Sequence, residues 1–135
     1  MIYIIRHGQT EMNQRQVLQG RSDHVLNEEG VRQAEKAAAE MRGITFDHVF
    51  SSPLKRAVQT AEIVAPCAEV KIDARLMEMD YGPFEGLDLN ALPPEIKTFF
   101  SDFVHNPAPE GMEPLSSVVE RAGRAGIRTL SPSVD

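Results

Sequence analysis

The 135-residue sequence predicts a layered α/β fold in which helices cover a largely parallel sheet. Three observations support this prediction. Short apolar runs, typical of strands that are covered on both faces, alternate along the chain with longer segments of helical periodicity. Glycines and prolines separate these segments. The first apolar run ends in Arg6-His7-Gly8, and open parallel sheets bind ligands beyond the carboxyl ends of their strands.

The first half of the chain is expected to contribute two strands and a helix. Met1–Ile5 is a nearly continuous apolar run and predicts the first strand, and the polar residues from His7 to Asp23 predict a loop. Asn27 can cap a helix from Glu28 to Arg42, because its apolar residues fall on one face. Phe46–Phe50 predicts the second strand.

Further elements follow with clear start and stop signals. Ser52-Pro53 is a favourable helix start, and the helix is expected to end near Pro66. Val70–Ile72 predicts a short third strand, and an irregular stretch follows. Pro93–Val104 predicts another helix. A Pro-rich loop, residues 106–114, leads to a last helix, for which Ser117 and Glu120 could form a capping box.

Composition narrows the class of protein. The hydrophobic and charged fractions, 41% and 25%, are those of an ordinary soluble globular protein, and the length suggests a single domain over residues 1–135. The net charge of −6 and the lack of a basic face argue against nucleic acid or an anionic membrane as partner. A single cysteine, Cys67, and the absence of a signal-peptide pattern predict a cytoplasmic location.

A set of polar side chains at predicted strand and helix ends indicates a phosphoryl-transfer pocket. Arg6 and His7 follow the first strand, and Glu78 precedes a Gly-containing loop. Arg56 lies near the start of a helix, where backbone N–H groups also favour anions. Guanidinium groups match the charged oxygens of a phosphoryl group with paired hydrogen bonds, and Asn13 could add an uncharged donor.

Each residue type has a role in such chemistry. A neutral imidazole at His7 can attack phosphorus and hold the group as phosphohistidine, which divides one displacement into two. Adjacent guanidinium groups should lower the pKa of His7 and keep it unprotonated. Glu78 is the candidate that gives a proton to the departing alkoxide and later takes one from water.

The sequence resembles the histidine phosphatase superfamily, the phosphoglycerate-mutase-like group. Four stretches carry the resemblance in the family's order and cover most of residues 1–87: RHGQTEMN, QGRSDHVLNEEGVRQA, SSPLKRAVQTAE and LMEMDYGPFEG. The resemblance implies a three-layer α/β/α architecture with a mostly parallel sheet. It also implies that His7 is the phosphorylated nucleophile and Glu78 the proton donor.

The same resemblance implies the phosphate-binding residues. Arg6, Asn13 and Arg56 match the residues that hold the phosphate. Gln19, Gly20 and Tyr81 match positions that approach substrate in the mutases. The segment Leu89–Pro109 occupies the place where family members vary their substrate-facing lid. Its three phenylalanines could face a substrate, but packing as an ordinary helix core is the favoured interpretation.

Within the family, the segments Gln19-Gly20 and Ser22-Asp23 resemble the broad phosphatase branch more than the glycolytic mutases. That branch includes enzymes that act on small phosphomonoesters, among them alpha-ribazole phosphate. We therefore expect a small phosphorylated metabolite as substrate, with no metal and no cofactor, and a homodimer is left open. Phosphoglycerate-mutase-type transfer and a catalytically impaired phospholigand-binding fragment are the alternatives. A P-loop NTPase or metal-dependent phosphatase is disfavoured, because the sequence contains no GxxxxGK[ST] segment and no convincing ligand spacing.

The sequence departs from the family near its end. Family members have a second pocket histidine after a late hydrophobic strand, and none of His24, His48 and His105 has that context. The C-terminal part of the domain is therefore expected to be missing, with the chain ending at Ser131-Pro132-Ser133-Val134-Asp135. We expect low activity, because the loss of one pocket donor typically costs about 10² to 10³ in rate. Lost strand partners would also leave sheet edges unpaired.

Overall fold

The computed structural model describes residues 1–126, so the predicted chain end at Ser131–Asp135 lies outside the described residues. Its centre is a parallel pair of strands, β1 (Val49–Ser51) and β2 (Val70–Ile72), with Val49 opposite Val70. The helix α3 (Lys55–Val64) connects the two strands and packs against both. This β–α–β unit confirms the α/β fold that the sequence predicts.

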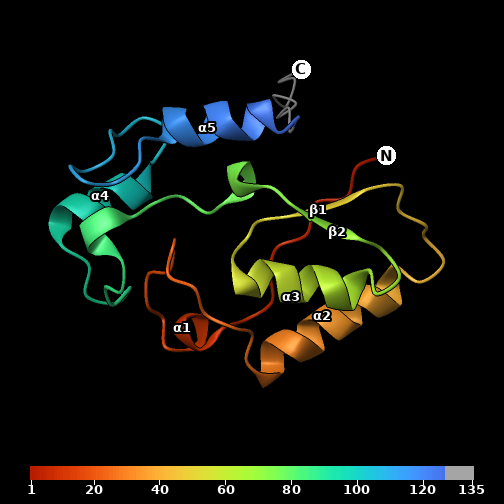
Figure 1. Ribbon diagram of the computed structural model, residues 1–135. Coiled ribbons are helices and arrows are strands. Elements are labelled where there is room, and N and C mark those ends of the chain that lie inside the picture. Colours follow the sequence, from red (N-terminus) through yellow and green to blue (C-terminus); the bar gives the residue numbers. More distant parts are fainter. Residues whose placement is uncertain (127–135) are drawn as a thin grey trace, which may run out of the picture.

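Helices lie on both sides of these strands. Helix α2 (Glu28–Glu40) packs against α3, and Figure 1 shows both on one side of the strands, with α5 (Leu115–Arg124) on the other. The side chain of Asn27 accepts a hydrogen bond from the Gly30 N–H at 2.8 Å, which confirms the expected cap of α2. None of the helices in the described part of the chain has the length and apolar character that crossing a bilayer requires.

The second half of the chain forms a separate small core. Two 3₁₀ turns, η1 (Ala74–Leu76) and η2 (Gly82–Phe84), precede the helix α4 (Pro94–Ser101). In the core, Ile96 and Phe99 of α4 pack with Met79, which precedes the helix, and Met112, which follows it. Phe99 is 2% exposed and Phe100 packs against the same cluster. The interpretation of these two phenylalanines as helix core is confirmed, whereas Phe103 is 49% exposed.

Two local predictions are wrong. The proposed capping box of the last helix does not form, because α5 begins at Leu115 and places Ser117 within its first turn. The Ser117 hydroxyl instead donates to Glu113. The loop His7–Asp23 also contains an unpredicted one-turn helix, α1 (Glu11–Gln14), closed by reciprocal bonds between Thr10 and Asn13.

The expected first strand does not form in the described part of the chain. Met1–Ile5 has no strand structure, and Ile2 and Ile4 are 80% and 78% exposed. Among the described residues, β1 has β2 as its sheet partner, and no ladder reaches Met1–Ile5. The aromatic ring of Tyr3 packs edge-on against Phe46 at 5.6 Å, so the segment lies beside the chain that enters β1 without pairing with it (Figure 1). An apolar run becomes a strand only where a neighbour satisfies its backbone groups.

Candidate active site

The imidazole of His7 is fixed in one tautomer by its own backbone neighbour. His7 is half-buried, and its Nδ1 lies 2.7 Å from the carbonyl oxygen of Gly8. A carbonyl oxygen can only accept a hydrogen bond, so Nδ1 carries the proton. In the neutral ring the lone pair is therefore on Nε2, which is the nitrogen available for attack on an electrophile.

The backbone beside His7 is anchored to two helices. The Gly8 N–H donates to the Thr60 hydroxyl at 3.0 Å, and that hydroxyl donates to the Arg56 carbonyl at 2.7 Å within α3. On its other side Gly8 packs so closely on the Gly30 backbone in α2 that a Cβ at position 8 would collide with the Gly30 carbonyl. Position 8 therefore requires glycine, and this close contact fixes the position of the backbone next to His7.

Burial and neighbouring positive charges favour the neutral form of the His7 ring. Burial lowers the pKa of His7 from 6.5, and the nearby positive charges of Arg56 and Arg6 lower it further, against the opposing effects of the Gly8 carbonyl and Glu78. The structure thus brings Arg6, Arg56 and Glu78 into electrostatic range of His7, as the sequence predicted. The neutral form of the imidazole is thus favoured beside two guanidinium groups.

Arg56 is the most deeply placed of these residues. Its side chain is 2% exposed, and its fork donates to the carbonyls of Ser22 at 2.7 Å and Gly20 at 2.5 Å. Burial lowers the pKa of Arg56, while Glu78, Glu85 and Asp23 support its positive charge. The residue predicted to hold phosphate therefore also holds the backbone of the Gly20–Ser22 loop. A guanidinium has further N–H groups that these two bonds do not use.

Asn13 and Gln19 converge on a buried threonine. The Thr10 N–H donates to Asn13 Oδ1 at 2.9 Å, and the Thr10 hydroxyl lies 2.9 Å from Gln19 Oε1. Thr10 itself has no exposed surface. The side-chain oxygen of Asn13 thus takes part in capping α1. Its side-chain nitrogen donates a hydrogen bond to no residue in the described part of the chain. That nitrogen remains a donor that could serve an anion.

Glu78 lies in an extended stretch whose backbone carbonyls accept hydrogen bonds from arginines elsewhere in the chain. Its side chain is exposed, and Oε1 accepts a hydrogen bond from the Met79 N–H at 2.8 Å. Its carbonyl accepts from Arg21 at 2.9 Å and from Arg121 of α5 at 3.2 Å. Arg121 also donates to the Met77 carbonyl at 2.5 Å. The backbone of Glu78 is therefore held by two arginines, while its exposed carboxylate has one hydrogen bond, to its own neighbour Met79.

Tyr81 and Gly20 pack against each other next to these charges. A Cβ at Gly20 would lie 2.6 Å from Tyr81 Cδ2, so the approach depends on glycine. Burial, and then the charges of Glu78 and Glu85, raise the pKa of Tyr81 to about 12. The phenol stays protonated at neutral pH and keeps its hydrogen-bond donor.

Sequence reasoning missed one residue of this site, Glu85. Its Oε1 accepts hydrogen bonds from the backbone N–H groups of Gly20 at 2.6 Å and Ser22 at 2.9 Å. A single acidic residue in a glycine-containing loop is usually interpreted as a solvated side chain. The available signal was that Glu85 lies within LMEMDYGPFEG, one of the four stretches that carry the family resemblance.

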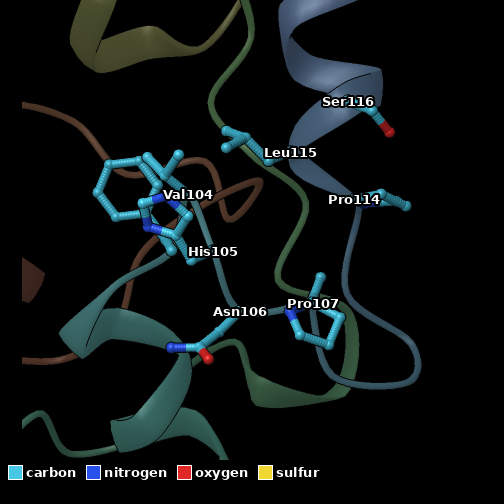
Figure 2. Close-up of a pocket in the computed structure, with 9 residues that line it drawn as sticks. Val104, His105, Asn106, Pro107, Pro114, Leu115 and Ser116 are labelled. Atoms are coloured by element: carbon cyan, nitrogen blue, oxygen red, sulfur yellow. The ribbon is translucent and has the colours of Figure 1, made fainter.

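The hollow drawn in Figure 2 is separate from this site. It has a volume of about 460 Å³ and is lined by the connection between α4 and α5, and Figure 2 shows Val104 and His105 on one side of it and Leu115 on another. None of the predicted site residues lines it. His105 pairs with Asp102 at 2.8 Å and is 79% exposed. His48 lies beside Lys71 at the strands.

Residues 1–126 contain no cluster of three or more His, Cys, Asp or Glu side chains arranged to hold a metal ion. The site consists of an imidazole, two guanidinium groups, two amides, a phenol and two carboxylates.

Comparisons with known proteins agree on one family. The model of the histidine phosphatase superfamily (branch 1) matches residues 2–131. A protein of Cronobacter sakazakii named "Probable phosphoglycerate mutase GpmB" is 37% identical over 136 residues, which cover 99% of this chain and 63% of that protein. The protein of the same name from Proteus mirabilis is 36% identical over 126 residues, covering 91% of this chain and 58% of its own length.

Solved structures give the same result. A phosphoglycerate mutase from Thermus thermophilus superposes with a TM-score of 0.75 at 30% identity, covering 91% of this chain and 70% of that one. A mycobacterial glucosyl-3-phosphoglycerate phosphatase superposes with a TM-score of 0.80 at 30% identity, covering 89% and 62%. The chain spans about three fifths of the length of the curated relatives that it matches.

Proposed function

The chain belongs to the histidine phosphatase superfamily, and from that premise we propose that it is a phosphomonoester hydrolase that works through a phosphohistidine on His7. One observation carries the proposal. The hydrogen bond from His7 Nδ1 to the Gly8 carbonyl leaves the lone pair on Nε2, in a ring whose neutral form burial and two arginines favour. A neutral imidazole beside guanidinium groups is the nucleophile that phosphoryl transfer to nitrogen requires.

In the first half-reaction, Nε2 of His7 forms a bond to phosphorus and the bond from phosphorus to the ester oxygen breaks. The departing alkoxide takes a proton from the carboxylic acid of Glu78 and leaves as an alcohol. The imidazole ring becomes positively charged, and the Gly8 carbonyl at Nδ1 stabilises that charge. In the second half-reaction, water gives a proton to Glu78 and attacks phosphorus, and the bond from phosphorus to Nε2 breaks to release phosphate.

The remaining predicted residues bind the substrate. Arg6 is exposed and free to turn toward a phosphoryl group, and Arg56 and the Asn13 amide nitrogen add further donors. Gln19, Gly20 and Tyr81 would contact the rest of a small phosphorylated metabolite. We propose that the reaction uses no metal or cofactor, since the imidazole and the carboxyl group supply the nucleophile and the proton, and that it takes place in the cytoplasm.

Mutase-type phosphoryl transfer is the second candidate. Proteins named as mutases and as phosphatases both appear among the relatives and structural neighbours, and both chemistries begin with a phosphohistidine. The two differ in the second half-reaction, where water or a substrate hydroxyl takes the phosphoryl group. A phospholigand-binding chain that no longer turns over is the third candidate.

Trapping the intermediate tests the proposal. The purified chain would be incubated with p-nitrophenyl phosphate, quenched in base, and analysed by intact and peptide mass spectrometry for an acid-labile phosphate. We expect the label on His7, its absence in His7→Ala, and an unchanged label in His48→Ala, which alters an exposed histidine beside Lys71. Release of inorganic phosphate supports a hydrolase, and transfer to added 3-phosphoglycerate supports a mutase. Ester binding without label on the folded protein would support the binder.

A further inference from the structure

Two side chains of opposite charge hold the backbone of the Gly20–Ser22 loop, one at its N–H groups and one at its carbonyls. The carboxylate oxygen Oε1 of Glu85 accepts hydrogen bonds from the N–H groups of Gly20 and Ser22, at 2.6 and 2.9 Å. The guanidinium of Arg56 donates to the carbonyls of the same two residues, at 2.5 and 2.7 Å. The three-residue loop is therefore clamped by a carboxylate that binds its N–H groups and a guanidinium that binds its carbonyls.

The carboxylate of Glu85 is committed to this clamp. Its second oxygen, Oε2, is buried, and no residue in the described part of the chain gives it a hydrogen bond. Burying a carboxylate oxygen without a partner is unfavourable, so the position must be maintained by what the other oxygen binds and by nearby charge. Glu85 supports the positive charge of Arg56, which binds the carbonyls of the same loop.

The clamp fixes the loop against the residues of the site. A Cβ at Gly20 would lie 2.9 Å from Glu85 Oε2 and 2.6 Å from Tyr81 Cδ2, so the loop has little room to shift. Arg56 in turn acts on His7 through its charge. Displacing the loop would release two hydrogen bonds of the Arg56 fork and let the guanidinium reorient.

We propose that Glu85 is a positioning residue of this site, which sets the Gly20–Ser22 loop and, through it, the Arg56 guanidinium for binding the phosphoryl group. The inference rests on the proposed function, because it assigns the phosphoryl group to the Arg56 side of His7. Glu85 acts through its hydrogen bonds to the loop and takes no part in proton transfer. Small misplacements of binding groups can reduce rates by large factors.

Three substitutions at one position separate geometry from charge. Glu85→Gln keeps an acceptor oxygen at the same distance and loses the charge. Glu85→Asp keeps the charge but is one methylene too short to reach both N–H groups. Glu85→Ala loses both. Glu120→Ala is the matched control, because Glu120 is a carboxylate on α5 whose side chain is 64% exposed.

Two measurements report on the variants. Amide hydrogen exchange at Gly20 and Ser22, followed by NMR, reads the clamp without any need for activity. The dissociation constant of orthovanadate, an analogue of the transferring phosphoryl group, and the rate of His7 labelling read the site. Circular dichroism verifies that each variant is folded.

We expect the order Gln, then Asp, then Ala from best to worst in both measurements. Glu85→Gln should stay within about threefold of the wild type, and Glu85→Ala should bind vanadate and protect the two amides about tenfold less or worse. Glu120→Ala should match the wild type. If Glu85→Ala does not fold, the order of Gln and Asp still decides the question.

Other results would overturn the inference. Better function with Asp than with Gln would show that charge, not position, is what Glu85 supplies. Wild-type vanadate affinity in Glu85→Ala would show that the clamp does not serve the site. If the wild type itself takes neither vanadate nor label, the proposed function fails, and that failure is distinguishable because it precedes any comparison of variants.

Discussion

Two adjacent stretches of the N-terminal segment show opposite relations between hydropathy and burial. Met1–Ile5 is apolar and yet exposed, with Ile4 at 78%. Gly8–Thr10 is small and polar and yet buried at both ends, with Thr10 at 0%. The second stretch is enclosed because Thr60, Asn13 and the Gly30 backbone satisfy or contact it. Partners for the backbone, and not hydropathy alone, decide which part of this segment is held.

The largest effect should come from filling the space at Gly8. Gly8→Ala places a Cβ against the Gly30 carbonyl, which is backbone and cannot move aside cheaply, so we expect a loss of about 3 kcal/mol in the free energy of unfolding. Ile4→Ala, in the exposed stretch, should change it by less than about 0.5 kcal/mol. Urea denaturation measures both, and equal effects would refute the contrast.

A smaller loss of stability should follow when Gly8 is kept but its hydrogen-bond acceptor, the Thr60 hydroxyl, is removed. Thr60→Val removes the hydroxyl between the Gly8 N–H and the Arg56 carbonyl, and we expect a loss of about 2 kcal/mol in the free energy of unfolding. The His7 label should fall as well, since Gly8 positions the ring. Thr98→Val, at an exposed position of α4, is the control. No change in stability would mean that Gly8 finds another acceptor.

The same contrast applies to two carboxylates near α5. Glu113, whose side chain is 11% exposed, binds Arg121 at 2.8 Å, whereas Glu120 pairs with Arg124 at 64% exposure. Hydrogen bonds from Arg121 lower the pKa of Glu113 from 4.5 to about 2. Glu113 therefore contributes stability that is fully present above pH 4.5 and is lost as the pH falls toward about 2.

Glu113→Gln should accordingly cost about 1–2 kcal/mol at pH 7 and flatten the acid limb of the stability curve. Glu120→Gln should cost less than about 0.5 kcal/mol and leave that limb unchanged. Thermal melting followed from pH 7 down to pH 2.5 compares the two. An acid limb that survives in Glu113→Gln would assign it to another group.

The smallest expected change is one of pH dependence. Because burial and nearby positive charges lower the pKa of His7 from 6.5, the midpoint of the acidic fall in the rate of His7 labelling should lie below pH 6.5. Arg6→Gln removes a positive charge that lowers this pKa, so the acidic limb should move to higher pH. Arg15→Gln, an exposed change in the same loop, should leave the limb in place. A shift to lower pH in Arg6→Gln would contradict the electrostatic account.

Local signals in the sequence predicted the elements that depend on local physics. The Asn27 cap and the apolar face of α2 were visible, and the strand Val70–Ile72 has the expected bounds. Ser52-Pro53 predicted a helix at this place but not its start, because α3 begins at Lys55 with Leu54 as its N-cap. Met1–Ile5 was not predictable in the same way, because a strand depends on a neighbour that no local pattern reveals. The Thr10–Asn13 capping box of α1 was readable but overlooked.

In the candidate site, too, features that depend on residue type were predictable and features that depend on distant partners were not. Residue chemistry pointed to His7, Arg6, Arg56 and Glu78, and the structure brings them together, although their catalytic roles stay predictions until the label is found. Glu85 could not be ranked from the sequence, because its importance comes from two backbone N–H groups more than 60 residues away. The tautomer of His7 likewise became visible only with the position of the Gly8 carbonyl.

The bonds from Arg121 to the backbone around Glu78 have a consequence for synthesis. The contacts that anchor Gly8 beside the nucleophile involve Gly30, Thr60 and Arg56, which all lie in or before α3. The carbonyls of Met77 and Glu78 accept hydrogen bonds from Arg121 on α5, the last described helix, which is synthesised later. A chain emerging from the ribosome could therefore anchor the backbone beside His7 before it could fix the extended stretch that carries Glu78. The two halves of one reaction site mature at different times, separated by the translation of the chain from α3 to α5.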